Sequence, residues 1–154
     1  MKLSVSQSFE LKCTVEVAFD DTLDCAHWTE FAGFAFIPGI VRAVPRTPGT
    51  VVVGSTYDVT NSDGSHHEEE VVALDRPRTS VRRIFGLSGA FALLVRQMEE
   101  TWTFSPLPSG CIARRVFEFE VTNSLLSPVG AVLLVPFRKA MQRHAERIAA
   151  RIAG

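Results

Sequence analysis

Residues 125–154, LLSPVGAVLLVPFRKAMQRHAERIAARIAG, decide the fold, because they form a long pattern with helical spacing. Ser127 and Pro128 are typical of a helix start, and Gly154 is typical of a helix end. Apolar residues recur at spacings of three, four and seven, with His144 on the same stripe: Val129, Val132, Leu133, Phe137, Ala140, Met141, Ile148 and Ile152. The stretch therefore predicts a long helix that packs along a large surface.

The two halves of this helix differ in character. Residues 129–137 are apolar nearly all round, which predicts burial on more than one side. Pro136 removes one backbone hydrogen bond and predicts a kink. The second half is amphipathic and basic, and we interpret its basic side as a solvated face.

Composition limits the class of protein. The chain has 154 residues, 46% of them apolar and 21% charged, which predicts a single domain over residues 1–154 with one hydrophobic core. A net charge of −1 gives no reason to expect a nucleic-acid partner. Its longest apolar run, 129–137, is well short of the roughly 20 residues that span a bilayer, so we expect no stable membrane insertion. A polar N-terminus and three widely spaced cysteines favour a cytoplasmic protein.

The remainder of the chain predicts seven strands, with two short helices between the first strand and the second. Residues 3–13 alternate between apolar and polar, which predicts a strand with one wet side. Residues 15–19 and 23–31 predict two short helices. Six further strands, separated by turn residues, are predicted over 40–45, 51–60, 65–74, 79–85, 94–104 and 112–121. Consecutive strands joined by turns predict an antiparallel sheet, and the fold class is α+β.

Several local motifs in this order resemble the START-like or Bet v 1-like (SRPBCC) superfamily, and within it the bacterial polyketide cyclase/dehydrase-type proteins. The matching segments are DCAHWTEF at 24–31, PGIV at 38–41, EEVVALDRPR at 69–78 and EETWTF at 99–104. The resemblance covers essentially the whole chain. It implies a helix-grip fold, in which a seven-stranded antiparallel sheet curls around the C-terminal helix and leaves an apolar cavity between them.

Three residues are candidates for catalysis if such a cavity exists. His144 lies on the apolar stripe of the terminal helix, where an imidazole can act as an acid or base. Arg83 and Glu100 each share a strand face with large apolar residues, so burial would require them to pair with each other or with a polar ligand. A structural role is the competing interpretation for all three. Arg115, beside Phe117 and Phe119, belongs to the same group.

Aromatic and apolar side chains supply the candidate ligand-binding walls: Tyr57, Phe85, Trp102, Phe104, Phe117, Phe119, Phe137 and Met141. For any single one of them, packing in the core is the preferred interpretation. His66 and His67 follow a hairpin turn and precede three glutamates, which predicts surface charge. They point to opposite faces of a strand and have no third ligand nearby, so we predict no metal, and we expect no cofactor. The apolar connection at 86–93 would line the mouth of a pocket or contact a second subunit in a homodimer.

Three functional hypotheses follow from this sequence. The first is a carrier or sensor that binds a hydrophobic or aromatic small molecule, lipid-like or polyketide-like, between the sheet and the terminal helix. A second is a polyketide aromatase/cyclase-type enzyme that uses an acid or base inside the cavity. The third is an interaction module whose cavity is filled by its own side chains. The sequence does not separate these hypotheses, because one fold hosts many functions.

Overall fold

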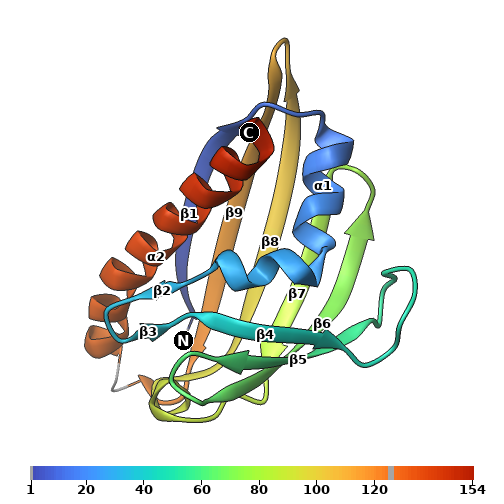
Figure 1. The fold of residues 1–154 in the computed structure, drawn as a ribbon. Helices are drawn as coiled ribbons and strands as arrows, with labels where there is room; N and C mark the ends of the chain where they lie inside the picture. Colours follow the sequence, from blue (N-terminus) through green and yellow to red (C-terminus); the bar gives the residue numbers. More distant parts are fainter. Residues whose placement is uncertain (1, 125–126) are drawn as a thin grey trace.

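The computed structural model describes residues 2–124 and 127–154, and its main feature is a strongly curved antiparallel sheet (Figure 1). Seven strands pair in the order β1-β9-β8-β7-β6-β5-β4. Their bounds are β1 (Lys2–Leu11), β4 (Ile40–Pro45), β5 (Thr56–Asn61), β6 (His66–Asp75), β7 (Thr79–Phe85), β8 (Val95–Leu107) and β9 (Gly110–Val121). The predicted α+β class and the seven-stranded antiparallel sheet are confirmed.

Two short helices follow β1, as predicted, although their boundaries differ. Helix α1 (Val15–Leu23) continues beyond the predicted end and is capped by Thr14, whose hydroxyl accepts a hydrogen bond from the Val17 amide at 3.3 Å. The 3-10 helix η1 (Cys25–Glu30) begins after Asp24, whose carboxylate accepts from the Ala26 amide at 3.0 Å. Both caps use side-chain oxygens to satisfy amides that have no partner within the helix.

A small hairpin, β2 (Gly33–Phe34) and β3 (Ile37–Pro38), was not predicted, because two-residue strands show no alternation. Gly33 is required there: its φ is +74°, and a Cβ atom would lie 2.1 Å from the Ile37 carbonyl oxygen. The connection after β7 contains a second 3-10 helix, η2 (Ala90–Leu93).

Helix α2 (Ser127–Ala153) crosses the concave side of the sheet as a continuous helix, with Pro136 inside it (Figure 1). Its inward face buries Leu133, Phe137, Ala140, Met141, His144 and Ile148. The side chain of Ser127, the predicted N-cap, lies outside the described part. No helix among the described residues is both long and apolar enough to cross a membrane.

The prediction that the first half of α2 is buried on more than one side is wrong. Val129, Val132 and Val135 are exposed, whereas Leu133 and Phe137 are buried. The helix forms the outer layer over the sheet, so only its inward stripe is covered. The apolar sequence of this half therefore predicted more burial than the structure shows.

Candidate functional site

A cavity of about 90 Å³ lies between the concave face of the sheet and the layer formed by η1 and α2. One part of its lining is apolar: Trp28, Phe31, Ile37, Ile84, Met98, Trp102, Phe117 and Phe137. The other part is polar although it is buried: Asn61, His67, Glu69, Arg82, Glu100, Arg115 and His144. We call the first set the aromatic wall and the second set the charged wall. The two sets are in contact, since the Arg82 guanidinium lies 4.0 Å from the Trp28 ring centroid and the Arg115 guanidinium lies 4.8 Å from that of Trp102.

Four of the polar residues form what we call the buried charge cluster: Glu69, Arg82, Glu100 and Arg115. They lie on the neighbouring strands β6, β7, β8 and β9, and all are on the inward side of the pleat. Arg82 is the cross-strand partner of Glu100, which brings opposite charges directly together. The sheet itself therefore builds the charged wall.

Glu100 is the centre of this cluster. Its Oε1 atom accepts hydrogen bonds from Arg82 and from the Trp102 indole, and its Oε2 atom accepts from Arg115 Nη2 at 2.9 Å. Burial raises the pKa of Glu100, but the charges of Arg115 and Arg82 outweigh burial and lower that pKa to about 2. Glu100 is therefore a fixed carboxylate and does not exchange protons near neutral pH.

His144 of α2 joins the cluster through Arg115. Arg115 Nη1 lies 2.8 Å from His144 Nδ1, and a guanidinium can only donate, so Nδ1 accepts and Nε2 carries the proton. Burial and the positive charge of Arg115 lower the pKa of His144 to about 2. The imidazole is therefore neutral and offers a hydrogen-bond donor at Nε2.

A second chain of polar contacts reaches the cavity from β5 and β6. Asn61 Nδ2 lies 3.1 Å from His67 Nδ1, and His67 Nε2 lies 3.0 Å from Glu69 Oε2. With the amide as donor, the histidine accepts at Nδ1 and donates from Nε2 to the carboxylate. The prediction of surface charge holds for His66, which is exposed, but is wrong for His67, which is buried.

Three buried polar atoms in this wall have no hydrogen-bond partner among the described residues. They are Arg82 Nη1, Arg115 Nε and Glu69 Oε1. Glu69 Oε1 does face a cation, since it lies 3.7 Å from Arg82 Nε, but this is too long for a hydrogen bond. Buried donors and acceptors of this kind are costly unless water or a ligand completes them.

The structure places Arg83 outside the site. Its side chain is exposed and lies 3.7 Å from Glu70, so the expectation that Arg83 faces the cavity is wrong. The prediction is off by one residue along β7, because the side chains that point inward are those of Ser80, Arg82 and Ile84. Two adjacent arginines fit either face of an alternating strand, and only the pairing with β8 selects Arg82.

The predicted ligand-binding residues separate into two groups. Trp102, Phe117 and Phe137 line the cavity, as do Glu100 and His144. Five others lie outside its lining: Tyr57, Phe85, Phe104, Phe119 and Met141. Phe119 and Met141 are fully buried core residues, Phe104 packs against Phe19, and Tyr57 packs against Trp28.

Four lining residues were not predicted from the sequence: Arg82, Glu69, His67 and Asn61. Alternation along β6 carried a signal, because His67, Glu69 and Val71 share a face and Val71 is an obvious core residue. Of the two alternatives for 86–93, the pocket mouth agrees with the structure, since Leu87, Ser88 and Phe91 line the cavity.

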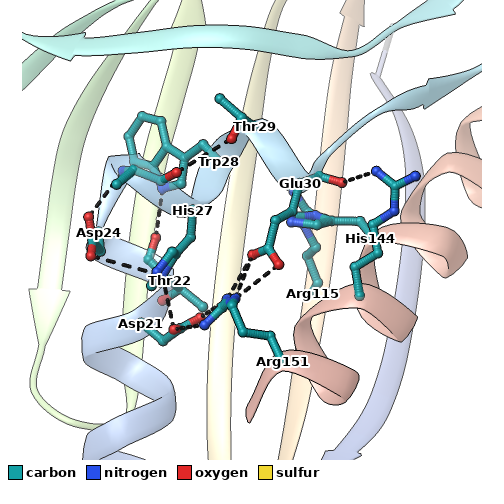
Figure 2. A network of polar contacts seen from close by, with 12 residues as sticks. Asp21, Thr22, Asp24, His27, Trp28, Thr29, Glu30, Arg115, His144 and Arg151 are labelled. Atoms are coloured by element: carbon teal, nitrogen blue, oxygen red, sulfur yellow. Dashed lines mark hydrogen bonds and ion pairs between the residues drawn. The ribbon is translucent and has the colours of Figure 1, made fainter. Parts of the chain in front are cut away.

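Arg151 links α2 to the two short helices, α1 and η1, through hydrogen bonds and ion pairs (Figure 2). Its guanidinium donates to Asp21 of α1 at 2.7 and 2.9 Å and to Glu30 of η1 at 2.7 to 3.0 Å. Arg147 adds a bond to the Glu30 carbonyl at 3.1 Å. We call Asp21, Glu30 and Arg151 the Arg151 network. All three also line the cavity.

Among the described residues, no group of three or more histidine, cysteine, aspartate or glutamate side chains is arranged to hold a metal ion. The polar wall agrees with this, because each carboxylate of the buried charge cluster lies next to an arginine. The expectation of no metal and no cofactor stays a prediction.

Comparisons with solved structures match this architecture over nearly the whole chain. The ginseng major latex-like protein 151 from Panax ginseng has a TM-score of 0.75 at 12% identity, with 99% of each chain covered. Norcoclaurine synthase from Thalictrum flavum has a TM-score of 0.64 at 14% identity, covering 98% of this chain and 88% of that one. The di-domain ARO/CYC StfQ from the steffimycin pathway has a TM-score of 0.69 at 15% identity, covering 97% of this chain and 50% of that one.

At these identities the likeness shows the fold alone, which is the predicted helix-grip fold of Bet v 1-like proteins. No curated protein matches the chain in sequence. A family model described as "Polyketide cyclase / dehydrase and lipid transport" matches residues 2–153. The chain therefore belongs to the polyketide cyclase/dehydrase and lipid transport family of the START-like (SRPBCC) superfamily.

Proposed function

We propose that this protein binds a compact hydrophobic or aromatic molecule with an oxygen-bearing edge in the cavity, as a carrier or sensor. The observation that supports this most directly is the mixed lining of the cavity. Aromatic side chains form one wall, and the other holds two buried N–H donors and one carboxylate oxygen without hydrogen-bond partners. An occupant with one apolar and one polar side satisfies both walls.

The aromatic wall supplies affinity. Phe117 and Phe137 pack edge to face at 4.9 Å, and Phe31 lies 6.1 Å from Phe137, so the wall is already assembled. A single aromatic ring buries about 150 Å², which stabilises the complex by about 4 kcal/mol at ~25 cal/mol per Å². A preassembled wall keeps most of that gain, because few side chains must be ordered on binding.

The charged wall supplies orientation. A carbonyl or phenol oxygen placed near Arg82 Nη1 and Arg115 Nε accepts their free hydrogen bonds, and a hydroxyl placed near Glu69 donates to its free oxygen. Two arginines and two glutamates already balance in charge within the cluster, so a neutral ligand fits without leaving an unpaired charge. The volume of about 90 Å³ favours a molecule with one ring.

Native mass spectrometry of freshly purified protein, compared with the denatured mass, tests whether a small molecule is retained. Calorimetric titration then compares 2-hydroxyacetophenone with ethylbenzene, which has a similar apolar body but no oxygen. We expect the oxygenated ligand to bind at least tenfold more tightly. Equal affinities, or binding of neither ligand together with a clean apo mass, would contradict the proposal and favour the interaction module.

Two variants sharpen this test. Arg82→Met should remove the preference for the oxygenated ligand, whereas Arg83→Met, the neighbouring exposed arginine, should leave it unchanged. If Arg82→Met fails to fold, the comparison of the two ligands on the unaltered protein still decides the matter.

An aromatase/cyclase-type reaction is the second candidate, and one observation favours it. Glu69 Oε1 is a buried carboxylate oxygen without a hydrogen-bond partner, and it lies beside the arginine donors. In such a reaction Glu69 accepts a proton from the substrate while Arg82 and Arg115 stabilise the developing oxyanion. Glu100 and His144, both with pKa values near 2, instead hold and orient these groups. Glu69→Gln should then abolish turnover of any substrate found while leaving its binding within a few fold.

A further inference from the structure

The outward face of α2 carries an exposed apolar strip. Val129, Val132 and Val135 are 48%, 66% and 69% exposed. Val132 and Val135 lie on the side of the helix away from Leu133 and Phe137, which are buried against the sheet, and Val129 lies at the edge of that side. The strip is thus separated from the cavity by the thickness of the helix, and it does not depend on the proposed ligand.

Positive charge continues this strip along the same helix. Arg138, Lys139 and Arg143 follow the valines, and α2 contains no acidic residue before Glu146. Val132, Val135, Lys139 and Arg143 are spaced by three and four residues, so they share one face. Arg138 and Lys139 are both exposed. The face is therefore apolar at its start and basic in its middle.

The β2–β3 hairpin extends this face beyond the helix. In Figure 1 the hairpin reaches α2, and the Arg143 guanidinium lies over the Phe34 ring at 4.6 Å. Phe36, at the turn of the hairpin, is 61% exposed. Its neighbour Ala35 has a φ of +51°, a left-handed conformation that residues other than glycine rarely adopt. A large aromatic side chain is thus held outward next to the basic part of α2.

We propose that the outward face of α2, together with Phe36, is a docking surface for an anionic phospholipid bilayer. Valine and phenylalanine side chains enter the boundary between headgroups and acyl chains, and the three cations contact the phosphates. A second copy of this chain fits less well. Two-fold pairing about the middle of this face would bring Lys139 against its own counterpart, and α2 has no acidic residue before Glu146 to compensate.

Vesicle co-sedimentation tests this surface. The vesicles contain phosphatidylcholine with or without an equal part of phosphatidylglycerol. We expect the full chain to bind the anionic vesicles, and to bind more weakly as salt is added. Val132→Ser/Val135→Ser should reduce the partition coefficient at least tenfold. Arg138→Gln/Lys139→Gln should reduce the partition coefficient by more than tenfold, because each cation contributes a factor of about five.

The matched control is Val52→Ser/Val53→Ser, which removes two valines of similar exposure from the connection between β4 and β5. This variant should bind anionic vesicles like the unaltered protein. Absence of binding to anionic vesicles would overturn the proposal, as would an equal loss in the control. A dimer detected by light scattering and dissociated by Val132→Ser/Val135→Ser would also overturn it, because the face would then belong to a second copy.

Discussion

Two arginine–carboxylate networks line the cavity, and they differ in burial and in how fully their polar atoms are hydrogen-bonded. In the Arg151 network, both carboxylates are paired with the same guanidinium and the arginine side chain is 31% exposed. In the buried charge cluster, the side chains of Arg82, Glu100 and Arg115 are at most 6% exposed. Yet only the cluster leaves buried donors, on Arg82 and Arg115, without hydrogen bonds among the described residues.

The difference suggests two roles. The Arg151 network attaches α2 to α1 and η1, and the buried charge cluster belongs to the proposed binding site. A partly exposed, bidentate arginine keeps α2 on α1 and η1 at little desolvation cost. Burying four charges in an apolar cavity is expensive, and a structure that needed only stability would gain from apolar residues there. Incomplete hydrogen bonding at the more expensive network is the observation on which the proposed binding role rests.

The largest expected effect comes from neutralising the centre of the cluster. Glu100→Gln leaves Arg82 and Arg115 buried without their shared carboxylate, which should lower the free energy of unfolding by about 3–5 kcal/mol. Chemical denaturation measures this change. Glu99→Gln, one residue along β8 and less buried, is the control and should change stability by under about 1 kcal/mol. Equal effects of the two variants would mean that the cluster does not carry this energy.

Acid should act on the same region with a defined sign. The folded-state pKa of His144 is about 2, below the ordinary 6.5, so below pH 6.5 the unfolded chain binds a proton that the folded protein does not. The free energy of unfolding should therefore fall as the pH falls, by about 1.4 kcal/mol per pH unit for this one group.

Glu100 adds to that loss below about pH 4.5, because its folded-state pKa is also about 2 and its stabilising charge disappears as the pH approaches that value. The variant His144→Gln removes the contribution of the histidine to the pH dependence and leaves that of Glu100. Denaturation curves measured at pH 7, 6 and 5 should show a smaller pH slope in this variant, and an unchanged slope would contradict the assignment.

Breaking the Arg151 network should have a smaller effect. Arg151→Gln removes the bonds to Asp21 and Glu30, whose side chains are 11% and 21% exposed, so we expect a loss of about 1–2 kcal/mol in unfolding free energy. Ligand affinity should change little, because the charged wall is untouched. A loss as large as that of Glu100→Gln would remove the distinction between the two networks.

The smallest expected effect is at Arg83. Arg83→Gln removes an exposed ion pair with Glu70, which contributes under about 0.5 kcal/mol, and thermal unfolding should be nearly unchanged. A large destabilisation would indicate that Arg83, and not Arg82, faces inward.

The fold was predictable because its signals are periodic. Alternation in β1, β8 and β9 and the helical stripe of α2 each fix a face, and turn residues fix the order of strands. The β2–β3 hairpin was not predictable, since two residues cannot show a period.

The site was predictable only in part. His144 and Glu100 stand out because each is a polar residue within an apolar stripe. Arg82 does not, because its neighbour is also arginine and only the register with β8 separates them. His67 and Glu69 lie within a polar run after a hairpin, and their burial depends on η1 and α2 covering that part of the sheet. Alternation along β6 shows that they share a face with Val71, but it does not show that η1 and α2 cover that face.

The central claim is that a small molecule occupies the cavity against both walls. The chain has two tryptophans, Trp28 and Trp102, and both line the cavity. Their indole N–H groups donate to the Thr22 carbonyl and to Glu100, so each gives a reporter in a two-dimensional nitrogen–proton NMR spectrum. On titration with 2-hydroxyacetophenone, both indole signals should move with one common midpoint. Two indole signals that stay in place at millimolar ligand would contradict the account.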